Sequence, residues 1–404
     1  MYTPMTIEIE TNEPRSAGQA FLIGPTYYLR PIELADAASA AVWDPSPYPT
    51  PVEVVEERLK EKLGDDVEDE MQQHRLLICR RSDDRPVGSV NFSYFQGREC
   101  AISMRYDPNR SLDEWAAIWS EIMRFTVPWL IEERNMMMVL ASFWGEHPVA
   151  METADALGMR KNIRLREAVI RNGQRYDWIW FEALHPGWVK RMGMPHGMEE
   201  GPAEREIRSP APLTWPNRGE APENAIIADD RLYLRPLEPD DAALVSQWMR
   251  QDTEISYPEG RFLHSPVTLG QQFTEIAKAN PPKWARFAIV LRETDELIGA
   301  NGIEDIDLIR RCGWTETEIW RPEHRSKGYG TEAKHLLLEY CFDRLNLHTV
   351  FSWVSEYNTR SSTALRKQGY RDAGYFAWSD FYKDGFTGGY CFDYLASEWR
   401  AARR

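Results

Sequence analysis

The stretch RPEHRSKGYGTEAKHLLLEYCF, from Arg321 to Phe342, joins a basic turn with two glycines directly to a segment with helical periodicity. A helix begins with N–H groups that have no partner within the helix, and these groups together with the helix dipole attract anions. Gly328 and Gly330 let a phosphate approach the backbone without a Cβ in the way, and Arg325 and Lys327 add positive charge. The stretch therefore indicates a phosphate-binding turn at the start of a helix.

The helix predicted after this turn has one apolar face. The spacing of that face is i, i+3, i+4, i+7, i+8 and i+12, and its residues are Ala333, Leu336, Leu337, Tyr340, Cys341 and Leu345. The turn has the spacing Arg-x-x-Gly-x-Gly, which is neither GxxxxGK(S/T) nor GxGxxG. Glycines near a helix start also serve ordinary capping and turn geometry. At this point a phosphate site and a plain loop are both open interpretations.

The elements predicted on both sides of the turn follow a mixed α/β order. Strand character is found at residues 231–237, 286–292, 296–306, 312–321 and 348–354, and helical character at residues 239–250, 267–279 and 358–370. A final hairpin is predicted for residues 373–396. The C-terminal part of the chain is therefore predicted to be an α/β domain in which the turn lies between a strand and a helix.

A related pattern occurs earlier in the chain. The segment YYLRPIELADAASAAVW at residues 27–43 matches LYLRPLEPDDAALVSQW at residues 232–248. Three further landmarks keep the same order, namely Gly88 with Gly299, Arg110 with Arg325, and Gly158 with Gly369. Four matches in one order indicate a duplicated domain.

The duplication predicts a domain at residues 1–185, a connector at 186–225 and a second domain at 226–404. The connector is rich in proline, glycine and charged residues and has little periodicity. Two interpretations are open for it: Trp188, Met192 and Trp215 pin it across both domains, or it is mobile.

Composition limits the classes of function. The formal net charge is −15, which argues against general nucleic-acid binding and is compatible with cationic substrates. Five scattered cysteines without a CxxC pair favour a reduced, intracellular protein. Neither a signal peptide nor a membrane span is indicated, so a cytoplasmic location is expected. His324, His348 and the cysteines have no metal-ligand spacing, so no metal site is expected.

The segments around the turn resemble the GNAT acyltransferase superfamily, particularly its RimJ/RimL-like branch. The resemblance covers nearly all of residues 232–395 and includes YLRPLEPDDA, LIGANGI, EIWRPEHRSKGYGTEA and LNLHTVFSWVSEYNTRSSTALRKQGY. It implies an α/β (α+β) fold of two tandem domains, each with a mixed, mostly antiparallel central sheet flanked by helices. It also implies acetyl-CoA as cosubstrate, a small-molecule or peptide amine as acceptor, and no part for nucleic acid or membrane. A homodimer is compatible with the resemblance.

The resemblance assigns residues to the binding of CoA. The pyrophosphate is expected on the turn, and the end of the preceding strand, Ile319 and Trp320, is expected to offer backbone groups to the pantetheine and the thioester carbonyl. Asn358 is expected to contact the pantetheine arm or to order the site, and its other interpretation is a helix N-cap. Ser326 stands where the family usually has a small residue. The residues expected at the pyrophosphate are Arg325, Ser326, Lys327, Gly328, Tyr329, Gly330 and Thr331.

Acyl transfer to an amine requires a base, because an alkyl ammonium has a pKa of about 10. The resemblance suggests a carboxylate on the strand before the turn or on the preceding hairpin. Glu318 is the first candidate, with Glu316 on the same face of that strand, and Glu304 is the next. A solvated carboxylate, or one paired with a neighbouring arginine, is the competing interpretation. Ser361, or a nearby tyrosine, is expected to neutralise the departing thiolate, whereas Tyr370 is expected in the core.

The N-terminal repeat lacks the features of this turn. Asp113 stands in the place of Gly328 and Trp115 in the place of Gly330, and the segment HPVAME faces YNTRSS without its Asn and Ser. The carboxylates of Asp113 and Glu114 repel a pyrophosphate, and the indole of Trp115 blocks the approach to the backbone. This copy is therefore expected to fold without binding CoA. The prediction is an acetyl-CoA-dependent N-acetyltransferase with one active domain. The alternative is a CoA-binding pseudoenzyme with a regulatory or scaffold role.

Overall fold

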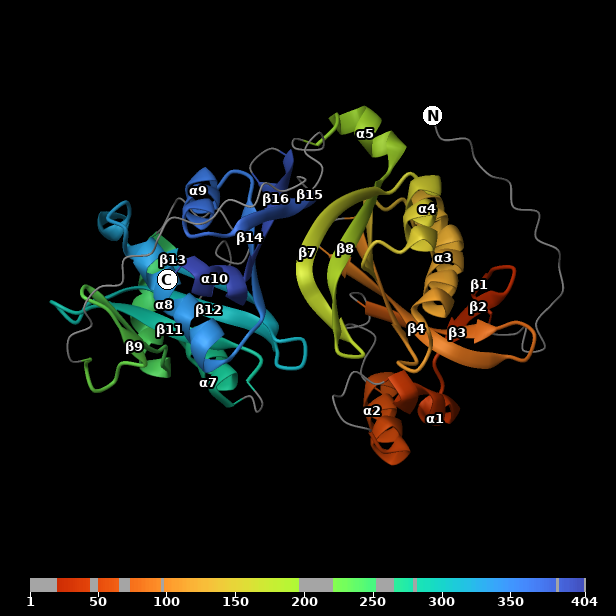
Figure 1. The fold of residues 1–404 in the computed structure, drawn as a ribbon, viewed down its shortest axis with the longest axis horizontal. Coiled ribbons are helices and arrows are strands. Elements are labelled where there is room, and N and C mark those ends of the chain that lie inside the picture. The colour runs from red at the N-terminus through yellow and green to blue at the C-terminus, as the bar shows by residue number, and fades with distance from the viewer. Residues whose placement is uncertain are drawn as a thin grey trace. The chain divides into compact units, whose positions relative to one another are not determined.

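The structure is a computed structural model that describes residues 20–43, 50–64, 73–95, 98–195, 221–251, 265–278, 282–382 and 385–402 (Figure 1). The chain divides into two compact units. Unit 1 is Met1–Ile163 with Trp178–Met198, and unit 2 is Arg164–Asp177 with Glu199–Arg404. Unit 2 therefore takes a short segment from the N-terminal sequence repeat.

The N-terminal half forms a sheet with the strand order β1-β2-β3-β4-β5-β6-β8-β7. Its strands are β1 (Leu22–Ile23), β2 (Tyr27–Pro31), β3 (Gln73–Arg80), β4 (Arg85–Phe95), β5 (Glu99–Tyr106), β6 (Met138–Trp144), β7 (Arg160–Arg171) and β8 (Gln174–Leu184). Its helices are α1 (Ala37–Ala40), α2 (Val52–Gly64), α3 (Leu112–Pro128), α4 (Pro148–Ala156) and α5 (Pro186–Met192). The strands β5 and β6 are parallel, and the pairs β2–β3, β3–β4, β4–β5 and β6–β8 are antiparallel.

Helix α3 supplies much of the core of unit 1. Trp119 is almost fully buried and lies against Phe143 of β6 and Phe181 of β8, with ring centroids 5.5 and 5.9 Å apart. Ile122 and Met123 of the same helix are fully buried. Burial of large aromatic side chains on this scale stabilises the unit without any ligand.

Unit 2 has the corresponding strand order, β9-β10-β11-β12-β13-β14-β16-β15. Its strands are β9 (Ile227–Ala228), β10 (Leu232–Pro236), β11 (Ala285–Leu291), β12 (Leu297–Asp307), β13 (Cys312–Ile319), β14 (Thr349–Ser355), β15 (Arg371–Tyr382) and β16 (Gly385–Leu395). Its helices are α6 (Ala242–Gln251), α7 (Pro266–Lys278), α8 (Tyr329–Glu339), α9 (Thr359–Lys367) and α10 (Ala396–Ala402). Here β13 and β14 are the parallel pair, and the neighbouring pairs are antiparallel.

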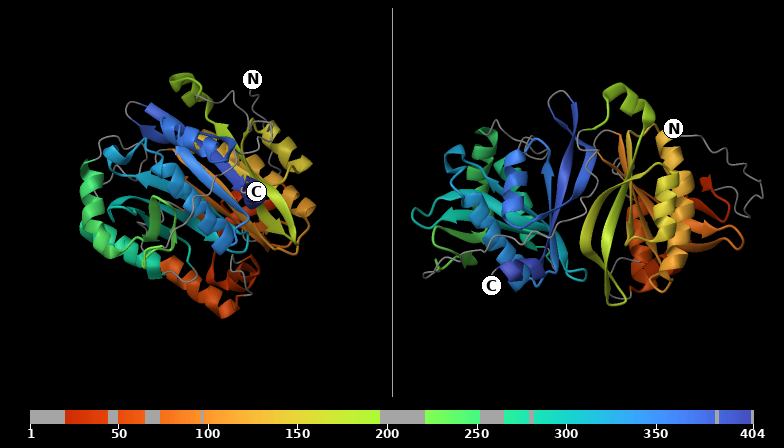
Figure 2. Two further views of the ribbon diagram at one scale, coloured as in Figure 1. Left: turned by 60° about the vertical axis from the view of Figure 1, so that its left-hand side comes forward. Right: turned by 45° about the horizontal axis from the view of Figure 1, so that its top comes forward.

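Helices cover both faces of the unit 2 sheet (Figures 1 and 2). On one face α8 buries Ala333, Leu336 and Leu337 against strand residues that include Ile289 and Ile303. On the other face a second core joins α6 and α7 to the sheet, with Trp248, Leu269 and Phe273 from the helices and Ala288, Ala300 and Trp320 from the strands. The apolar helix face predicted after the quoted turn is confirmed, because its first five predicted residues lie in or against the first of these cores.

The predicted fold class is confirmed: the structure is mixed α/β with mostly antiparallel sheet flanked by helices. The two halves share details beyond strand order. Arg30 pairs with Asp36 at 2.7 Å, and Arg235 pairs with Asp241 at 2.8 Å, at matching places after the second strand of each half. Each carboxylate also closes a capping box with the preceding Glu33 or Glu238.

The predicted connector, residues 186–225, starts with the short helix α5 rather than with irregular chain. Trp188 of this helix donates from Nε1 to Asn135 Oδ1 at 3.1 Å, so it is anchored within unit 1. Residues 196–220, with Trp215, lie outside the described residues.

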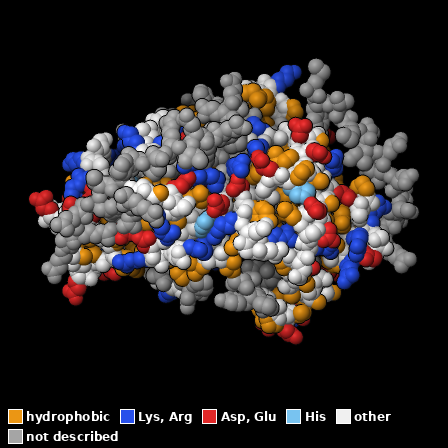
Figure 3. All heavy atoms as spheres, in the orientation of Figure 1, with side chains coloured by type: hydrophobic (Ala, Val, Ile, Leu, Met, Phe, Trp, Pro, Cys, Tyr) orange, Lys and Arg blue, Asp and Glu red, His pale blue; other side chains and the backbone are white. Residues whose placement is uncertain are grey.

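All five cysteines are buried free thiols. No helix among the described residues is long and apolar enough to cross a membrane. On the face shown in Figure 3, acidic and basic side chains of the described residues are interspersed, with no continuous basic area.

Candidate active site

The quoted turn has the backbone of a helix start that leaves its first N–H groups uncapped by any side chain. Gly328 is the N-cap of α8 with φ 86° and ψ −6°, and no side chain caps this end. Helical bonding begins with the N–H groups of Thr331 and Glu332, both bonded to Gly328 O at 3.1 Å. The N–H groups of Tyr329 and Gly330 precede these bonds. This is the arrangement that binds an anion at a helix N-terminus.

The two glycines of the turn differ in the effect that a Cβ would have at each position. At Gly328 the positive φ is the constraint, because a Cβ there would make only ordinary contact, 3.5 Å from Arg231 Nη2. Gly330 has no such φ, and a Cβ there would lie 3.7 Å from Ile319 Cγ1. Ser326 also has a positive φ, 62°. A residue with a Cβ is strained in this region, which accounts for the small residue expected at this position from the family resemblance.

Arg325 fastens the turn to the end of β13. Its Nε donates to Ile319 O at 2.9 Å and its Nη2 donates to Trp320 O at 3.0 Å. The N–H of Trp320 donates to Ile298 O at 3.1 Å. The structure therefore brings Arg325, Ile319 and Trp320 together, but it gives Arg325 a backbone-clamping role. The groups of Ile319 and Trp320 that were expected to face pantetheine take part in this clamp.

Arg231, which sequence reasoning missed, supplies positive charge on the turn. It lies just before β10, and its Nη1 donates to Lys327 O at 3.3 Å. Its guanidinium carbon lies 4.8 Å from the centroid of the Tyr329 ring, and its Nε donates to Glu332 Oε2 at 2.8 Å. About half of the Arg231 side chain is exposed. A lone arginine far away in the sequence carried no motif that could have linked it to the turn.

Glu332, the partner of Arg231 in the first turn of α8, has a raised pKa. Burial and a hydrogen bond with Asp229 raise the pKa of this carboxyl to about 7, although Arg231 acts in the opposite direction. The negative charge of Glu332 is therefore weakened close to where an anion is expected. This lessens the electrostatic cost of bringing a phosphate to the turn.

The strands β13 and β14 separate beside the turn's helix. Their ladder pairs Cys312 with Thr349, Gly313 with Val350 and Trp314 with Phe351. Both strands continue beyond these residues, β13 to Ile319 and β14 to Ser355. Among the described residues, positions 315–319 of β13 pair with β12 and not with β14. The gap between two separating strands exposes backbone groups that a linear ligand can reach.

Side chains hold the point where the two strands separate. Thr315 Oγ1 donates to Phe351 O at 3.0 Å, and Ser352 Oγ donates to Thr315 O at 2.9 Å. The hydroxyl groups of Thr315 and Tyr370 are 2.7 Å apart. All three side chains are buried, and burial raises the pKa of Tyr370 well above its ordinary value. Tyr370 is therefore a core residue, as predicted from the sequence.

A buried lysine lies beside this point. Lys334 of α8 is 3% exposed, and its Nζ lies 5.9 Å from the centroid of the Tyr370 ring. Burial lowers the pKa of this amine to about 7. The helix periodicity predicted from the sequence gave no role to this position, since it is polar and lies next to the apolar face.

Asn358 is an N-cap, as its alternative interpretation required. Its Oδ1 accepts from the backbone N–H of Ser361 at 3.1 Å and so caps α9. Ser361 lies half-buried in the first turn of that helix. The contact brings the two predicted residues together at the start of α9. Their roles toward a ligand stay predictions.

The candidate carboxylates lie on one face of the sheet. Strand register sets Arg286, Gly302 and Glu316 side by side on β11, β12 and β13, with Glu304 and Glu318 two residues along their strands. Arg286 Nε donates to Glu316 Oε1 at 2.6 Å. A Cβ on Gly302 would lie 3.1 Å from Arg286 Cγ and 3.3 Å from Glu316 Oε1, so the glycine leaves room for this pair. Because Ala288, Ala300 and Trp320 share this face, it is the face covered by α6 and α7.

Glu304 and Glu318 differ in environment. Burial and the nearby Glu316 carboxylate raise the pKa of Glu304 to about 8, with Arg286 opposing them. Glu318 instead accepts a hydrogen bond from Trp320 Nε1 at 2.9 Å. A carboxyl that changes charge near neutral pH is suited to proton transfer, and a carboxylate held by an indole is suited to positioning.

The corresponding helix start in unit 1 is closed by its own side chains. Ser111 caps α3 by accepting from Glu114 N at 3.1 Å, and Glu114 Oε2 accepts from Ser111 N at 2.9 Å. Trp115, 3% exposed, stacks on Tyr106 at the end of β5 with centroids 4.1 Å apart. The Tyr106 ring lies 5.0 Å from Trp144 at the end of β6. Aromatic side chains thus occupy the region that separating strands leave in unit 2.

The described residues contain no group of three or more His, Cys, Asp or Glu side chains arranged to hold a metal ion. His324 instead lies 3.4 Å from Glu296 through Nε2, beside the turn.

Comparison with known proteins finds similarity in the part of the chain that contains this site. Residues 231–371 match the profile of the acetyltransferase (GNAT) domain. The chain is 27% identical over 168 residues to the uncharacterized N-acetyltransferase YnaD of Bacillus subtilis (strain 168), which covers 39% of this chain and 94% of that protein. It is 27% identical over 177 residues to the uncharacterized N-acetyltransferase p20 of Bacillus licheniformis, which covers 42% and 96% respectively.

Solved structures give a further likeness. A chimera of the spermidine N-acetyltransferase SpeG from Vibrio cholerae and hSSAT is 23% identical, with a TM-score of 0.39, and covers 43% of this chain and 100% of that chain. The C-terminal half of the chain is therefore similar to the acetyltransferase (GNAT) domain and to N-acetyltransferases.

Proposed function

We propose that the protein transfers an acetyl group from acetyl-CoA to a primary amine by direct attack, in a single active site in unit 2. We assign that unit to the RimJ/RimL-like branch. Support comes from β13, which connects the parts of the site. One end of this strand is clamped to the phosphate turn by Arg325, its middle carries Glu316, and its start is where β14 diverges. Acetyl-CoA would supply the activated acyl group as a thioester.

The residues proposed for the phosphates are those around the start of α8. The N–H groups of Tyr329 and Gly330 face the anion from the helix end, and Lys327 and Arg231 supply positive charge. Arg325 acts indirectly through its hold on β13. Ser326, Gly328 and Thr331 shape the turn. The assignment adds Arg231 to the residues that the motif names.

Glu304 is proposed as the general base. Its carboxyl lies on the face covered by α6 and α7, and its pKa of about 8 is close to the pH at which the reaction must run. Proton removal from an ammonium with a pKa of about 10 becomes more favourable when the accepting carboxylate is itself basic. Glu316 and Arg286 set that basicity, and Glu318 orients Trp320 beside them. Ser361 remains the proposed donor to the departing thiolate.

The acceptor is proposed as a class. A small amine, a polyamine, an aminoglycoside-like antibiotic and a peptide N-terminus all present the required amine. The carboxylates Glu304, Glu316 and Glu318 share one face with Arg286. Such a face favours acceptors that carry positive charge.

The N-terminal repeat is proposed to be a degenerate copy without CoA binding. Support comes from the closed capping box of Ser111 and Glu114 and from the buried stack of Trp115 on Tyr106. The capping box closes the N-cap position that Gly328 leaves without a side-chain cap in unit 2.

The experiment that tests the function is release of CoA thiol from acetyl-CoA in the presence of an amine and peptide library. We expect turnover with at least one primary amine, and loss of acetyl-CoA affinity in Gly328→Asp, where a carboxylate meets the phosphate. Gly330→Ala is the matched control, since its Cβ has room.

A pseudoenzyme is the second candidate. It predicts tight acetyl-CoA binding, no thiol release with any member of the library, and no effect of Glu304→Gln on binding. Unchanged acetyl-CoA affinity in Gly328→Asp would reject the proposed site in either case.

A further inference from the structure

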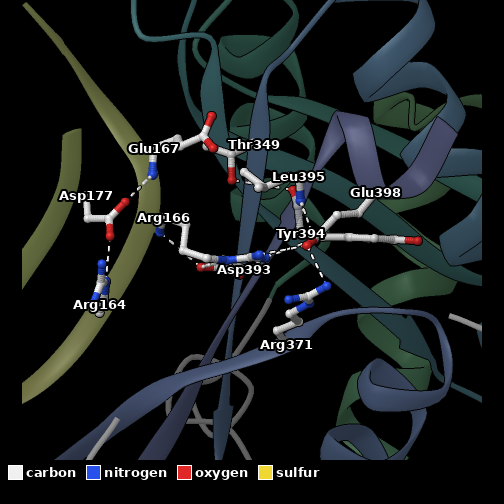
Figure 4. Close-up of polar contacts among 10 residues, drawn as sticks. All are labelled: Arg164, Arg166, Glu167, Asp177, Thr349, Arg371, Asp393, Tyr394, Leu395 and Glu398. Atoms are coloured by element: carbon white, nitrogen blue, oxygen red, sulfur yellow. Dashed lines mark hydrogen bonds and ion pairs between the residues drawn. The ribbon is translucent and has the colours of Figure 1, made fainter. Parts of the chain in front are cut away.

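Unit 2 contains a segment that precedes its own sequence repeat. Residues 164–177, the distal part of the β7–β8 hairpin, cluster with residues 199–404. Their contacts with β16 and α10 are shown in Figure 4. Arg166 lies at the centre of these contacts, and its side chain reaches two carboxylates. A boundary drawn between the repeats at residue 185 separates this segment from the unit in which it packs.

Arg166 makes a dense set of charge-assisted hydrogen bonds. Its Nη2 donates to Asp393 Oδ1 at 2.6 Å, and its Nη1 donates to Glu398 Oε1 at 2.7 Å. Its backbone N–H donates to Asp393 Oδ2 at 3.0 Å. Arg371 pairs with the same Glu398 at 2.7 Å. Hydrogen bonds of this kind fix geometry as well as charge, because a guanidinium is planar and its donors point in set directions.

The carboxylates are removed from water. The Asp393 side chain is 0% exposed, and those of Arg166 and Glu398 are each 16% exposed. Burial acts to raise the pKa of Glu398, yet hydrogen bonding and the charges of Arg166 and Arg371 lower it. A buried carboxylate that loses such a donor pays a large desolvation cost. Arg166 therefore supplies hydrogen bonds to the buried carboxylate of Asp393 both from its Nη2 and from its backbone N–H.

Two further contacts of the segment lie at the same end of the unit. Glu167 Oε2 is 2.6 Å from His348 Nε2, just before β14. Arg175 Nη1 donates to Arg310 O at 3.0 Å, in the turn before β13. The segment thus touches residues that lead into both of the strands that later separate. Glu167 has a φ of 51° and is held by a bond from its N–H to Asp177 Oδ1 at 2.9 Å.

Strand register connects Asp393 to the active site. Asp393 of β16 lies opposite Phe351 of β14. Phe351 is the last residue of β14 that pairs with β13, through Trp314, and its carbonyl accepts from Thr315 Oγ1. The residue held by Arg166 is therefore the cross-strand neighbour of the residue at which β14 leaves β13.

We propose that Arg166 of this segment positions the active site: it holds Asp393, which sets β16 against β14 at the point where β13 and β14 separate. The inference rests on the proposed function, because it assumes that the gap between these strands takes part in acetyl-CoA binding. It gives the N-terminal repeat a role that requires no CoA site of its own. Arg166 is a positioning residue, since it acts through Asp393.

The test compares two arginines of one strand in the full-length protein. Arg166→Met removes the side-chain donors to Asp393 and keeps the backbone N–H that also bonds to it. Arg164→Met removes an arginine that pairs with Asp177 within the hairpin and is 44% exposed. For both variants we measure acetyl-CoA affinity by calorimetry, KM and kcat by thiol release, and the unfolding temperature. We expect Arg166→Met to weaken acetyl-CoA binding about tenfold or more, since small displacements of a binding geometry have large effects. Arg164→Met should match the wild-type protein within about twofold.

Rescue separates positioning from folding. Asp393→Asn in the Arg166→Met background removes the buried charge that has lost its guanidinium and should restore part of the lost affinity. Arg166→Lys keeps the charge but not the fork geometry, and should give an intermediate affinity even if Arg166→Met does not fold. Wild-type acetyl-CoA affinity and KM in Arg166→Met or Arg166→Lys, with only a lower unfolding temperature, would overturn the inference. Failure of the wild-type protein to bind acetyl-CoA would instead reject the proposed function, and the inference with it.

Discussion

Glu304 illustrates how the surroundings of a single residue determine its chemistry. The sequence offers Glu304, Glu316 and Glu318 as carboxylates on neighbouring strands, with nothing to rank them by basicity. In the structure Glu316 is paired with Arg286 and Glu318 accepts from an indole, whereas Glu304 is left half-buried beside a like charge. Burial and like-charge repulsion both favour its protonated form. These surroundings support the proposal that Glu304 is the base.

Activity is therefore expected to depend on the ionisation of Glu304. The base form is deprotonated, so kcat/KM should rise with pH up to about 8 and fall as pH decreases below it. Glu304→Gln should remove this limb and reduce kcat about 100-fold or more, in the range typical of a lost general base. The measurement is the pH profile of thiol release, with Glu318→Gln as control. If kcat/KM of Glu304→Gln still rises with pH in the same way, a group other than Glu304 is responsible for the rise.

The raised pKa of Glu304 also affects stability, which decreases with rising pH where activity increases. The folded state favours protonated Glu304, so its contribution is present below the ordinary carboxyl pKa and is lost as pH rises through about 8. Glu304→Gln mimics the protonated form and should therefore make the free energy of unfolding less dependent on pH across that interval.

Arg231 gives the second prediction at this scale. Its guanidinium contacts Lys327 O and stacks over Tyr329, next to the N–H groups proposed for the pyrophosphate. A charge-assisted contact contributes about 1.5–3 kcal/mol, so Arg231→Ala should raise KM for acetyl-CoA about tenfold and leave kcat nearly unchanged. Initial-rate kinetics at saturating amine check this. Glu332→Gln, which removes the competing carboxylate, should not weaken binding; equal weakening in both variants would point to a disturbed turn instead.

At the scale of elements, the start of α8 and the ends of β13 and β14 work together. Arg325 holds the turn on β13, and Thr315, Ser352 and Tyr370 hold the point where the strands part. The corresponding start of α3 is closed by Ser111, Glu114 and Trp115. The same helix-after-strand arrangement can thus be open or closed, and a few residues at the helix N-terminus make the difference.

The two glycines of the turn should respond differently to alanine. Gly328→Ala places a Cβ at a φ of 86° and should lower the free energy of unfolding by about 1–2 kcal/mol and weaken acetyl-CoA binding. Gly330→Ala meets only an ordinary contact and should be neutral or stabilising by up to about 1 kcal/mol, because alanine favours the helix. Chemical denaturation and calorimetric titration measure both quantities. Equal effects of the two substitutions would contradict the assigned role of Gly328.

At the scale of the whole molecule, the two repeats share a strand order and differ in what their helix starts leave open. Unit 1 buries aromatic side chains where unit 2 leaves separating strands, and it has a core of its own around α3. Unit 2 in turn includes residues 164–177 of the first repeat. The duplication in sequence therefore does not divide the structure at the same residues.

One acetyl-CoA should bind per chain of 404 residues. Calorimetry on the full-length protein is expected to give a stoichiometry near one, and Gly328→Asp is expected to abolish all of the binding. Trp115→Ala, which opens the aromatic stack of unit 1, should leave the stoichiometry at one because Asp113 and Glu114 still repel an anion there. A stoichiometry of two, or binding that persists in Gly328→Asp, would assign a CoA site to the N-terminal repeat.

The sequence by itself determined the elements, the repeat and the turn. Apolar periodicity identified α8 and its buried face, and the spacing of Gly328 and Gly330 predicted a phosphate turn, because both depend on residues close together in the chain. Only the tertiary structure showed that Arg325 clamps β13 and that Arg231 reaches the turn. It also showed that the pKa of Glu304 is raised and that Arg166 donates to Asp393. These results depend on burial and on contacts between distant segments, and a local pattern carries no information about either.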